Sequence, residues 1–132
     1  MQKHDLMIIG TGPAGLSAAL YGARLGLRTV VFGDIPGGNT QMIEKLDNYP
    51  GFPDGISGPQ FGVFAFQQAQ QQGAIFTMNR IQTLEKTGTM FTGTDASGEQ
   101  YKAPCVIIAT GRIPKRLAVP KASAMRWRTG FA

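Results

Sequence analysis

Glycines near the N-terminus have the spacing of a phosphate-binding turn. The pattern Gly10-x-Gly12-x-x-Gly15 follows an apolar stretch at residues 5–9 and precedes an Ala- and Leu-rich segment. In a strand–turn–helix unit the first glycine makes the tight turn, the second lets a pyrophosphate approach the backbone, and the third lets helix and strand pack closely. The helix N-terminus also offers free N–H groups to phosphates. The motif predicts a dinucleotide site; the alternative is a purely structural turn.

An acidic residue at the end of the following strand usually accompanies this turn, because it accepts hydrogen bonds from the adenosine ribose hydroxyls. Here the apolar strand predicted at residues 29–32 is followed by Gly33, where the acid is expected, and then by Asp34. Asp34 is therefore our candidate for the ribose contact. The alternative is a solvated aspartate in a turn.

The elements that must position these residues begin with a parallel βαβ unit. It comprises a strand at 5–9, a helix reaching about residue 25 and closed by Gly26, and the strand at 29–32. Residues 33–59 are rich in Gly, Pro, Asn and Asp and are predicted to be mostly loop.

A second helix is predicted at residues 59–72, ended by Gly73. The apolar strand at 105–109 suits the middle of a parallel sheet covered on both faces. Alternating short segments predict one further sheet strand and a small meander, at residues 74–78, 81–86, 90–94 and 100–102. The predicted fold class is α/β, a Rossmann-like parallel sheet with flanking helices and a small β-meander.

The charge distribution disfavours nucleic-acid binding, although the net charge is +5. Residues 1–111 carry seven Lys and Arg against eight Asp and Glu, whereas residues 112–132 carry six basic residues and no acidic one. Only Trp127 and Phe131 could provide aromatic stacking there. We therefore divide the chain into a dinucleotide-binding domain at 1–120 and a basic, irregular tail at 121–132.

The remaining residues that could carry chemistry are assigned structural roles. His4, the single histidine, is expected at the surface, without a catalytic or metal-binding role. Cys105, the single cysteine, is expected to be a small buried hydrophobe without redox chemistry. We predict no metal site and no catalytic residue. Because no apolar run approaches the roughly 18 to 20 residues of a membrane span, we expect a cytoplasmic protein without membrane association.

Five motifs in register make residues 4 to about 120 resemble the thioredoxin reductases, which are FAD-dependent pyridine nucleotide-disulfide oxidoreductases. The motifs are Gly10-Thr11-Gly12-Pro13-Ala14-Gly15, Pro36-Gly37-Gly38, Asp47-Asn48-Tyr49-Pro50-Gly51-Phe52, Ser57-Gly58-Pro59 and Ile107-Ile108-Ala109-Thr110-Gly111. The resemblance implies that the glycine-rich turn binds FAD rather than the nicotinamide cofactor.

The resemblance also implies roles for single residues. Asn39, with Gly38 and Asn48, would lie along the ribityl chain and the flavin; it stands where the family usually has Gln and is one methylene shorter. Ile81 matches the position whose backbone contacts the adenine, and Thr110-Gly111 matches the stretch that returns past the flavin. The pyrophosphate would be held by Gly10, Gly12, Pro13, Ala14 and Gly15.

The function implied is the FAD-binding portion of a flavoprotein oxidoreductase that passes electrons from NAD(P)H through FAD. The family's Cys-x-x-Cys, its NADPH-binding domain and its final FAD segment would lie beyond residue 132, so NAD(P)H is expected only in full-length relatives. Two alternatives stay open: a non-catalytic ADP- or FAD-binding module, and a fragment of an enzyme resembling the ferredoxin–NADP reductases. Whether this chain alone is an enzyme, and whether it forms a homodimer, also stays open.

From residue 121 the sequence departs from the family pattern. A natural truncation, an engineered fragment and a diverged end are the interpretations left open.

Overall fold

A parallel sheet lies at the centre of the protein, whose computed structural model describes residues 2–113. Its strand order is β4 (Ile75–Thr77), β3 (Thr29–Phe32), β2 (Leu6–Ile9) and β8 (Cys105–Ile108), and all neighbouring strands run parallel. The register pairs Ile9 with both Phe32 and Ile108, so the strands end at one common edge of the sheet. The predicted Rossmann-like α/β class is confirmed.

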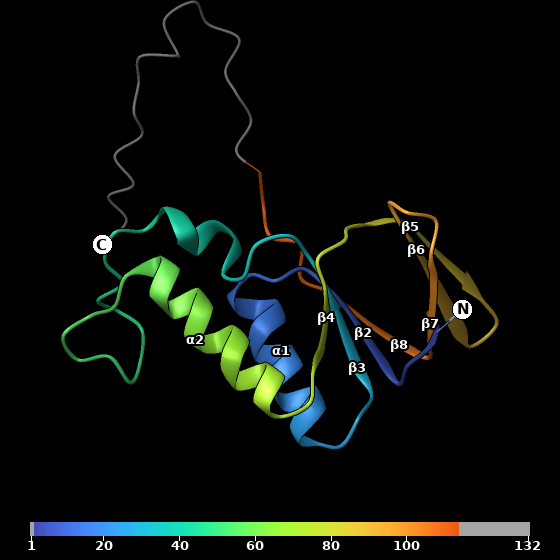
Figure 1. Cartoon of the computed structure of the whole chain (residues 1–132), viewed down its shortest axis with the longest axis horizontal. Helices are drawn as coiled ribbons and strands as arrows, with labels where there is room; N and C mark the ends of the chain where they lie inside the picture. The colour runs from blue at the N-terminus through green and yellow to red at the C-terminus, as the bar shows by residue number, and fades with distance from the viewer. Residues whose placement is uncertain (1, 114–132) are drawn as a thin grey trace, which may run out of the picture.

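Helices cover one face of this sheet and a second sheet covers the other (Figure 1). The helices are α1 (Pro13–Arg24) and α2 (Gly58–Gln71), and the short 3-10 helix η1 (Gly38–Met42) precedes α2. The second sheet has the order β1 (Gln2–Lys3), β7 (Gln100–Ala103), β6 (Met90–Asp95) and β5 (Ile81–Thr87). Its β5–β6–β7 part is the predicted antiparallel meander.

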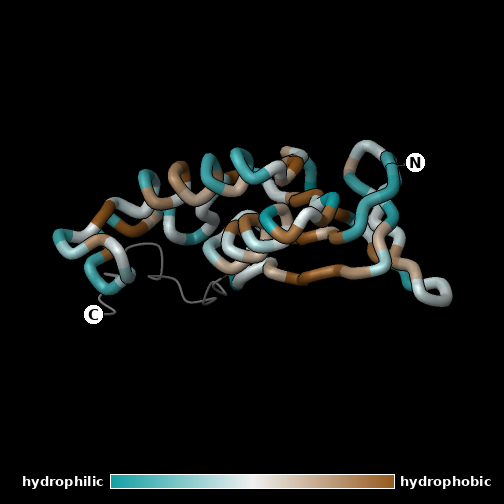
Figure 2. Tube along the Cα trace, turned by 90° about the horizontal axis from the view of Figure 1, so that it is seen from below, coloured by the Kyte–Doolittle hydropathy of each residue, from teal (hydrophilic) through white to brown (hydrophobic). Residues whose placement is uncertain are grey.

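The alternation of side chains along the central strands builds a core on each face of the parallel sheet. Leu6 and Ile8 of β2 pack towards the helices, with Ala19 of α1 and Ala69 of α2. Met7, between them in sequence, packs on the opposite side, in a cluster completed by Val30, Phe32, Tyr101 and Ala103. Figure 2 shows long hydrophobic stretches of the chain running through the middle of the molecule.

The long segment between β3 and α2 holds more structure than predicted. Besides η1, an isolated antiparallel bridge joins Leu46 to Ile56 and closes the intervening residues into a loop. Ser57 caps α2 by accepting a hydrogen bond from the backbone N–H of Gln60 at 3.3 Å.

The expected position of the last strand is wrong. Within residues 2–113, β8 is an outer strand that pairs only with β2, and Ile107 and Ile108 are 40% and 68% exposed. Cys105 is correspondingly exposed rather than buried. An apolar run is typical of a strand covered on both faces, but strand order is decided by tertiary pairing, which composition does not encode.

The expected surface location of His4 is also wrong. His4 is 7% exposed where β1 joins β2, and its backbone N–H donates to the Lys102 carbonyl at 2.8 Å. Its ring lies 6.2 Å from that of Tyr101, and neither ring nitrogen has a hydrogen-bond partner within residues 2–113. Burial and the nearby Arg28 charge lower the pKa of His4, although Asp5 acts in the opposite direction.

The predicted tail at 121–132 lies outside the described residues. In the part of the chain that is described, no helix is both long and apolar enough to cross a membrane.

Candidate dinucleotide-binding site

The predicted phosphate-binding turn joins β2 to α1 at the common strand edge, and its outer glycines are required by packing. Gly10 has a φ of 120°, and a Cβ there would lie 2.1 Å from the Ala109 carbonyl oxygen. A Cβ on Gly15 would lie 1.9 Å from the Gly10 carbonyl oxygen. Any side chain at either position would collide with backbone, so these glycines let the turn, the helix and β8 approach one another.

Gly12 differs from these glycines because the fold does not require it. Its φ of −71° and ψ of 179° suit any residue, and a Cβ there would meet nothing within 4 Å. Gly12 is the N-cap of α1, and no side chain caps that end of the helix, whereas α2 has Ser57. The space beside Gly12 is therefore open at an uncapped helix end, where an anion would be stabilised by the partial positive charge of the helix N-terminus.

The segment that follows β3 folds back over this turn. The Thr11 hydroxyl donates to the Ile35 carbonyl at 2.9 Å, and the Gly37 N–H donates to the Thr11 carbonyl at 2.7 Å. A Cβ on Gly38 would lie 3.2 Å from the Gly12 Cα. These contacts place Gly38 against the glycine-rich turn.

The predicted flavin-side residues are only partly assembled. The Asn39 amide nitrogen donates to the Arg112 carbonyl at 2.8 Å, which brings η1 beside the Thr110-Gly111 stretch after β8. Asn48, by contrast, lies exposed in the loop between Leu46 and Ile56, and within residues 2–113 no hydrogen bond links it to the turn.

The predicted adenine-side residues meet at the ends of β3 and β4. The Arg80 Nε donates to the Asp34 Oδ2 at 2.6 Å, so Asp34 lies beside the residue that precedes Ile81. Ile81 packs against the cluster of Phe32 and Tyr101. Sequence reasoning missed Arg80, because an ion pair between residues 46 positions apart leaves no local signal.

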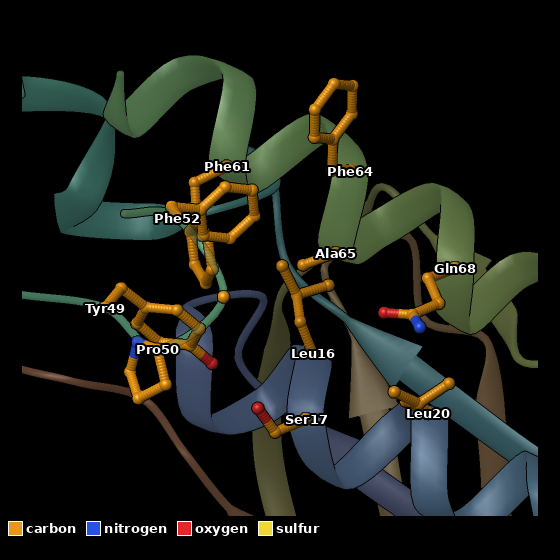
Figure 3. A pocket seen from close by; sticks show the side chains of 11 residues that line it. Leu16, Ser17, Leu20, Tyr49, Pro50, Phe52, Phe61, Phe64, Ala65 and Gln68 are labelled. Atoms are coloured by element: carbon orange, nitrogen blue, oxygen red, sulfur yellow. The ribbon is translucent and has the colours of Figure 1, made fainter. Parts of the chain in front are cut away.

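A separate pocket of about 330 Å³ lies between α1, α2 and the loop at residues 49–52 (Figure 3). Its lining is mostly apolar and aromatic, with Ser17 and Gln68 as polar members, and the Tyr49 ring packs 4.6 Å from that of Phe61. Its lining includes Leu16, Ser17 and Leu20 of α1 but no residue of the glycine-rich turn. It is therefore distinct from the space in front of Gly12.

Comparisons with known proteins agree with this geometry. Residues 4–130 match the pyridine nucleotide-disulphide oxidoreductase family. NADPH-dependent thioredoxin reductase 3 of Arabidopsis thaliana is 37% identical over 133 residues, which cover 97% of this chain and 25% of the plant protein. Thioredoxin reductase of Streptomyces clavuligerus is 37% identical over 126 residues, which cover 94% of this chain and 39% of that protein.

Solved structures show the same similarity. Thioredoxin reductase from Lactococcus lactis aligns with a TM-score of 0.84 at 29% identity, over 89% of this chain and 38% of that one. The enzyme from Streptococcus pyogenes aligns with a TM-score of 0.82 at 34% identity, with the same coverage of 89% and 38%. The chain spans 25% to 39% of the length of the two curated relatives. It belongs to the pyridine nucleotide-disulphide oxidoreductase family and corresponds to the FAD-binding, Rossmann-like portion of thioredoxin reductase-like members.

Proposed function

We propose that this chain binds FAD with the pyrophosphate at Gly12, in front of α1. The observation that carries the proposal is the open space at an uncapped helix end, bordered by Gly38 and by a turn whose other glycines are fixed by packing. A bulky dianion can approach the backbone only where Cβ atoms are absent, and Gly12 provides such a place without being needed for the turn.

The proposed binding mode assigns each part of the cofactor to one part of the strand edge. The pyrophosphate contacts residues 10–15, and the adenosine lies towards Asp34 and the backbone of Ile81. The ribityl chain and the flavin run along Gly38, Asn39 and Asn48 and past Thr110-Gly111. Asn39 donates its amide hydrogen to Arg112, so its carbonyl oxygen is the group that can accept a hydrogen bond from the cofactor.

In this proposal the chemistry belongs to the flavin, which accepts hydride from NAD(P)H and passes electrons on. The residues of this chain bind and orient the cofactor. The helix end and the backbone N–H groups stabilise the phosphate charge, and η1 covers the turn. The nicotinamide and disulfide steps of the relatives named above are proposed for the whole protein to which such a portion belongs.

Titration calorimetry on the full 132-residue chain tests the proposal, with FAD, ADP and adenosine as ligands. We expect ADP and FAD to bind at one site in mutual competition. Adenosine should bind much more weakly, because it lacks the pyrophosphate that the helix end stabilises. Equal affinity for adenosine and ADP, or no competition between ADP and FAD, would contradict the proposed mode.

A further inference from the structure

The end of β3, at Gly33, has no room for the acidic side chain that usually accepts hydrogen bonds from the adenosine ribose. A Cβ on Gly33 would lie 2.5 Å from the Thr11 Oγ1 and 2.8 Å from its Cγ2. Thr11 cannot easily turn away, because it is 7% exposed and its hydroxyl is bound to the Ile35 carbonyl. The side chain of the glycine-rich turn thus fills the space that an acid at position 33 would need.

The next residue, Asp34, supplies a carboxylate one position later, and Arg80 fixes its orientation. Arg80 lies between β4 and β5, at the same strand edge as the turn, and its Nε donates to the Asp34 Oδ2 at 2.6 Å. Within residues 2–113 the Asp34 Oδ1 has no hydrogen-bond partner. One carboxylate oxygen is therefore held by the arginine, and the other can accept a hydrogen bond from a ligand hydroxyl.

The pair contributes little to the stability of the fold. The side chains of Arg80 and Asp34 are 69% and 40% exposed, and ion pairs of this kind stabilise proteins only weakly. The ion pair also offsets the negative charge of Asp34, which would otherwise repel the phosphates of a nucleotide. Its effect should therefore be seen in ligand recognition rather than in folding.

We propose that Arg80 is a positioning residue for adenosine ribose recognition, which holds the Asp34 carboxylate so that its free oxygen accepts a ribose hydroxyl. This inference rests on the proposed nucleotide site. Asp34, oriented by Arg80, makes the ribose contact that an acidic residue at position 33 would usually make, since that position is occupied by Gly33. A guanidinium suits this role because its planar N–H donors fix the orientation of a carboxylate.

The test compares the affinities for ADP, 2′-deoxy-ADP and 3′-deoxy-ADP by calorimetry on the full chain. In the wild type we expect at least one deoxy analogue to bind about tenfold more weakly than ADP, the loss typical of a hydrogen bond to a charged group. In Arg80→Met and in Asp34→Asn this discrimination should disappear, and the double variant should lose no more than either single one. Arg80→Lys should restore only part of it, because an ammonium lacks the planar donor geometry.

Controls separate this inference from the proposed function. Arg24→Met removes the same charge from the exposed last turn of α1 and should leave all affinities unchanged. An Arg80→Met variant that keeps the wild-type discrimination, or weakens ADP and both analogues equally, would overturn the inference while leaving the site intact. Tighter, Arg80-dependent binding of an ADP that carries a 2′-phosphate would also overturn it, because the arginine would then be a direct anion ligand. Absence of ADP binding in the wild type would refute the nucleotide site itself.

Discussion

Replacing Gly12 with Asp separates the stability of the turn from its capacity to hold a phosphate. The backbone of Gly12 suits any residue, and its Cβ position is open. Asp is a favoured N-cap residue, because its carboxylate accepts hydrogen bonds from the first-turn N–H groups. We therefore expect Gly12→Asp to fold, with a free energy of unfolding that is unchanged or raised by about a few tenths of a kcal/mol.

The same carboxylate would occupy the space that the phosphates need. Two like unit charges about 4 Å apart repel each other by roughly 4 kcal/mol at an effective dielectric constant of about 20. Gly12 is half-buried, so solvent screening should reduce this repulsion to about 2 to 3 kcal/mol, a loss of roughly 30- to 140-fold in affinity. Capture of the first-turn N–H groups by the new cap would weaken binding further.

The assay pairs thermal denaturation with ADP titration for the wild type, Gly12→Asp and Gln60→Asp. The last variant adds the same charge to the exposed first turn of α2 and should bind ADP as the wild type does. A Gly12→Asp protein that is folded and binds ADP as tightly as the wild type would refute the placement of the pyrophosphate.

Three further predictions concern stability. Gly15→Ala should lower the free energy of unfolding by about 1 to 3 kcal/mol or more, because the new Cβ would lie 1.9 Å from the Gly10 carbonyl oxygen. Chemical denaturation measures this loss, with Ser17→Ala as the control. Equal stabilities of the two variants would contradict the prediction. The pKa of His4 is lowered in the folded protein, so the imidazole binds a proton more readily in the unfolded chain. The melting temperature should therefore fall as the pH drops below 6.5. The variant His4→Phe should flatten this pH dependence between about pH 7 and 5. Hydrogen bonds to the Asp95 carboxylate, of which that from the Ser97 hydroxyl has the largest effect, lower its pKa to about 2. The ionised carboxylate should therefore stabilise the fold above its ordinary pKa of 3.8, and this contribution should be lost as the pH falls through 2. The variant Asp95→Asn should reduce this acid dependence in a circular-dichroism titration.

Local sequence signals were sufficient for the elements that carry the turn. The strand predicted at 29–32 has the observed bounds, and Gly26 and Gly73, with φ of 79° and 100°, follow the two α-helices as expected. Such features depend on patterns within a few neighbouring residues: an apolar run for a strand, a helical period for a helix, and a glycine that can adopt positive φ for the helix end. The spacing of the glycines at 10, 12 and 15 likewise placed the turn correctly.

Features set by long-range pairing could not be predicted in this way. His4 is buried because β1 pairs with β7, a strand almost a hundred residues later, and Cys105 is exposed because β8 is an outer strand within the described residues. The Arg80–Asp34 ion pair depends on β3 and β4 lying side by side. The exclusion of a side chain at position 33 depends on where Thr11 points, which a glycine-rich motif does not specify.

Backbone amide chemical shifts measured by NMR during a titration with ADP test the central claim most directly. If the pyrophosphate lies in front of α1, the amides of Gly12, Ala14 and Gly15 should shift most, because their N–H groups face the ligand. The account would be contradicted if the amides of Tyr49 and Phe61, in the pocket between α1 and α2, shifted most and the amides of the turn did not shift.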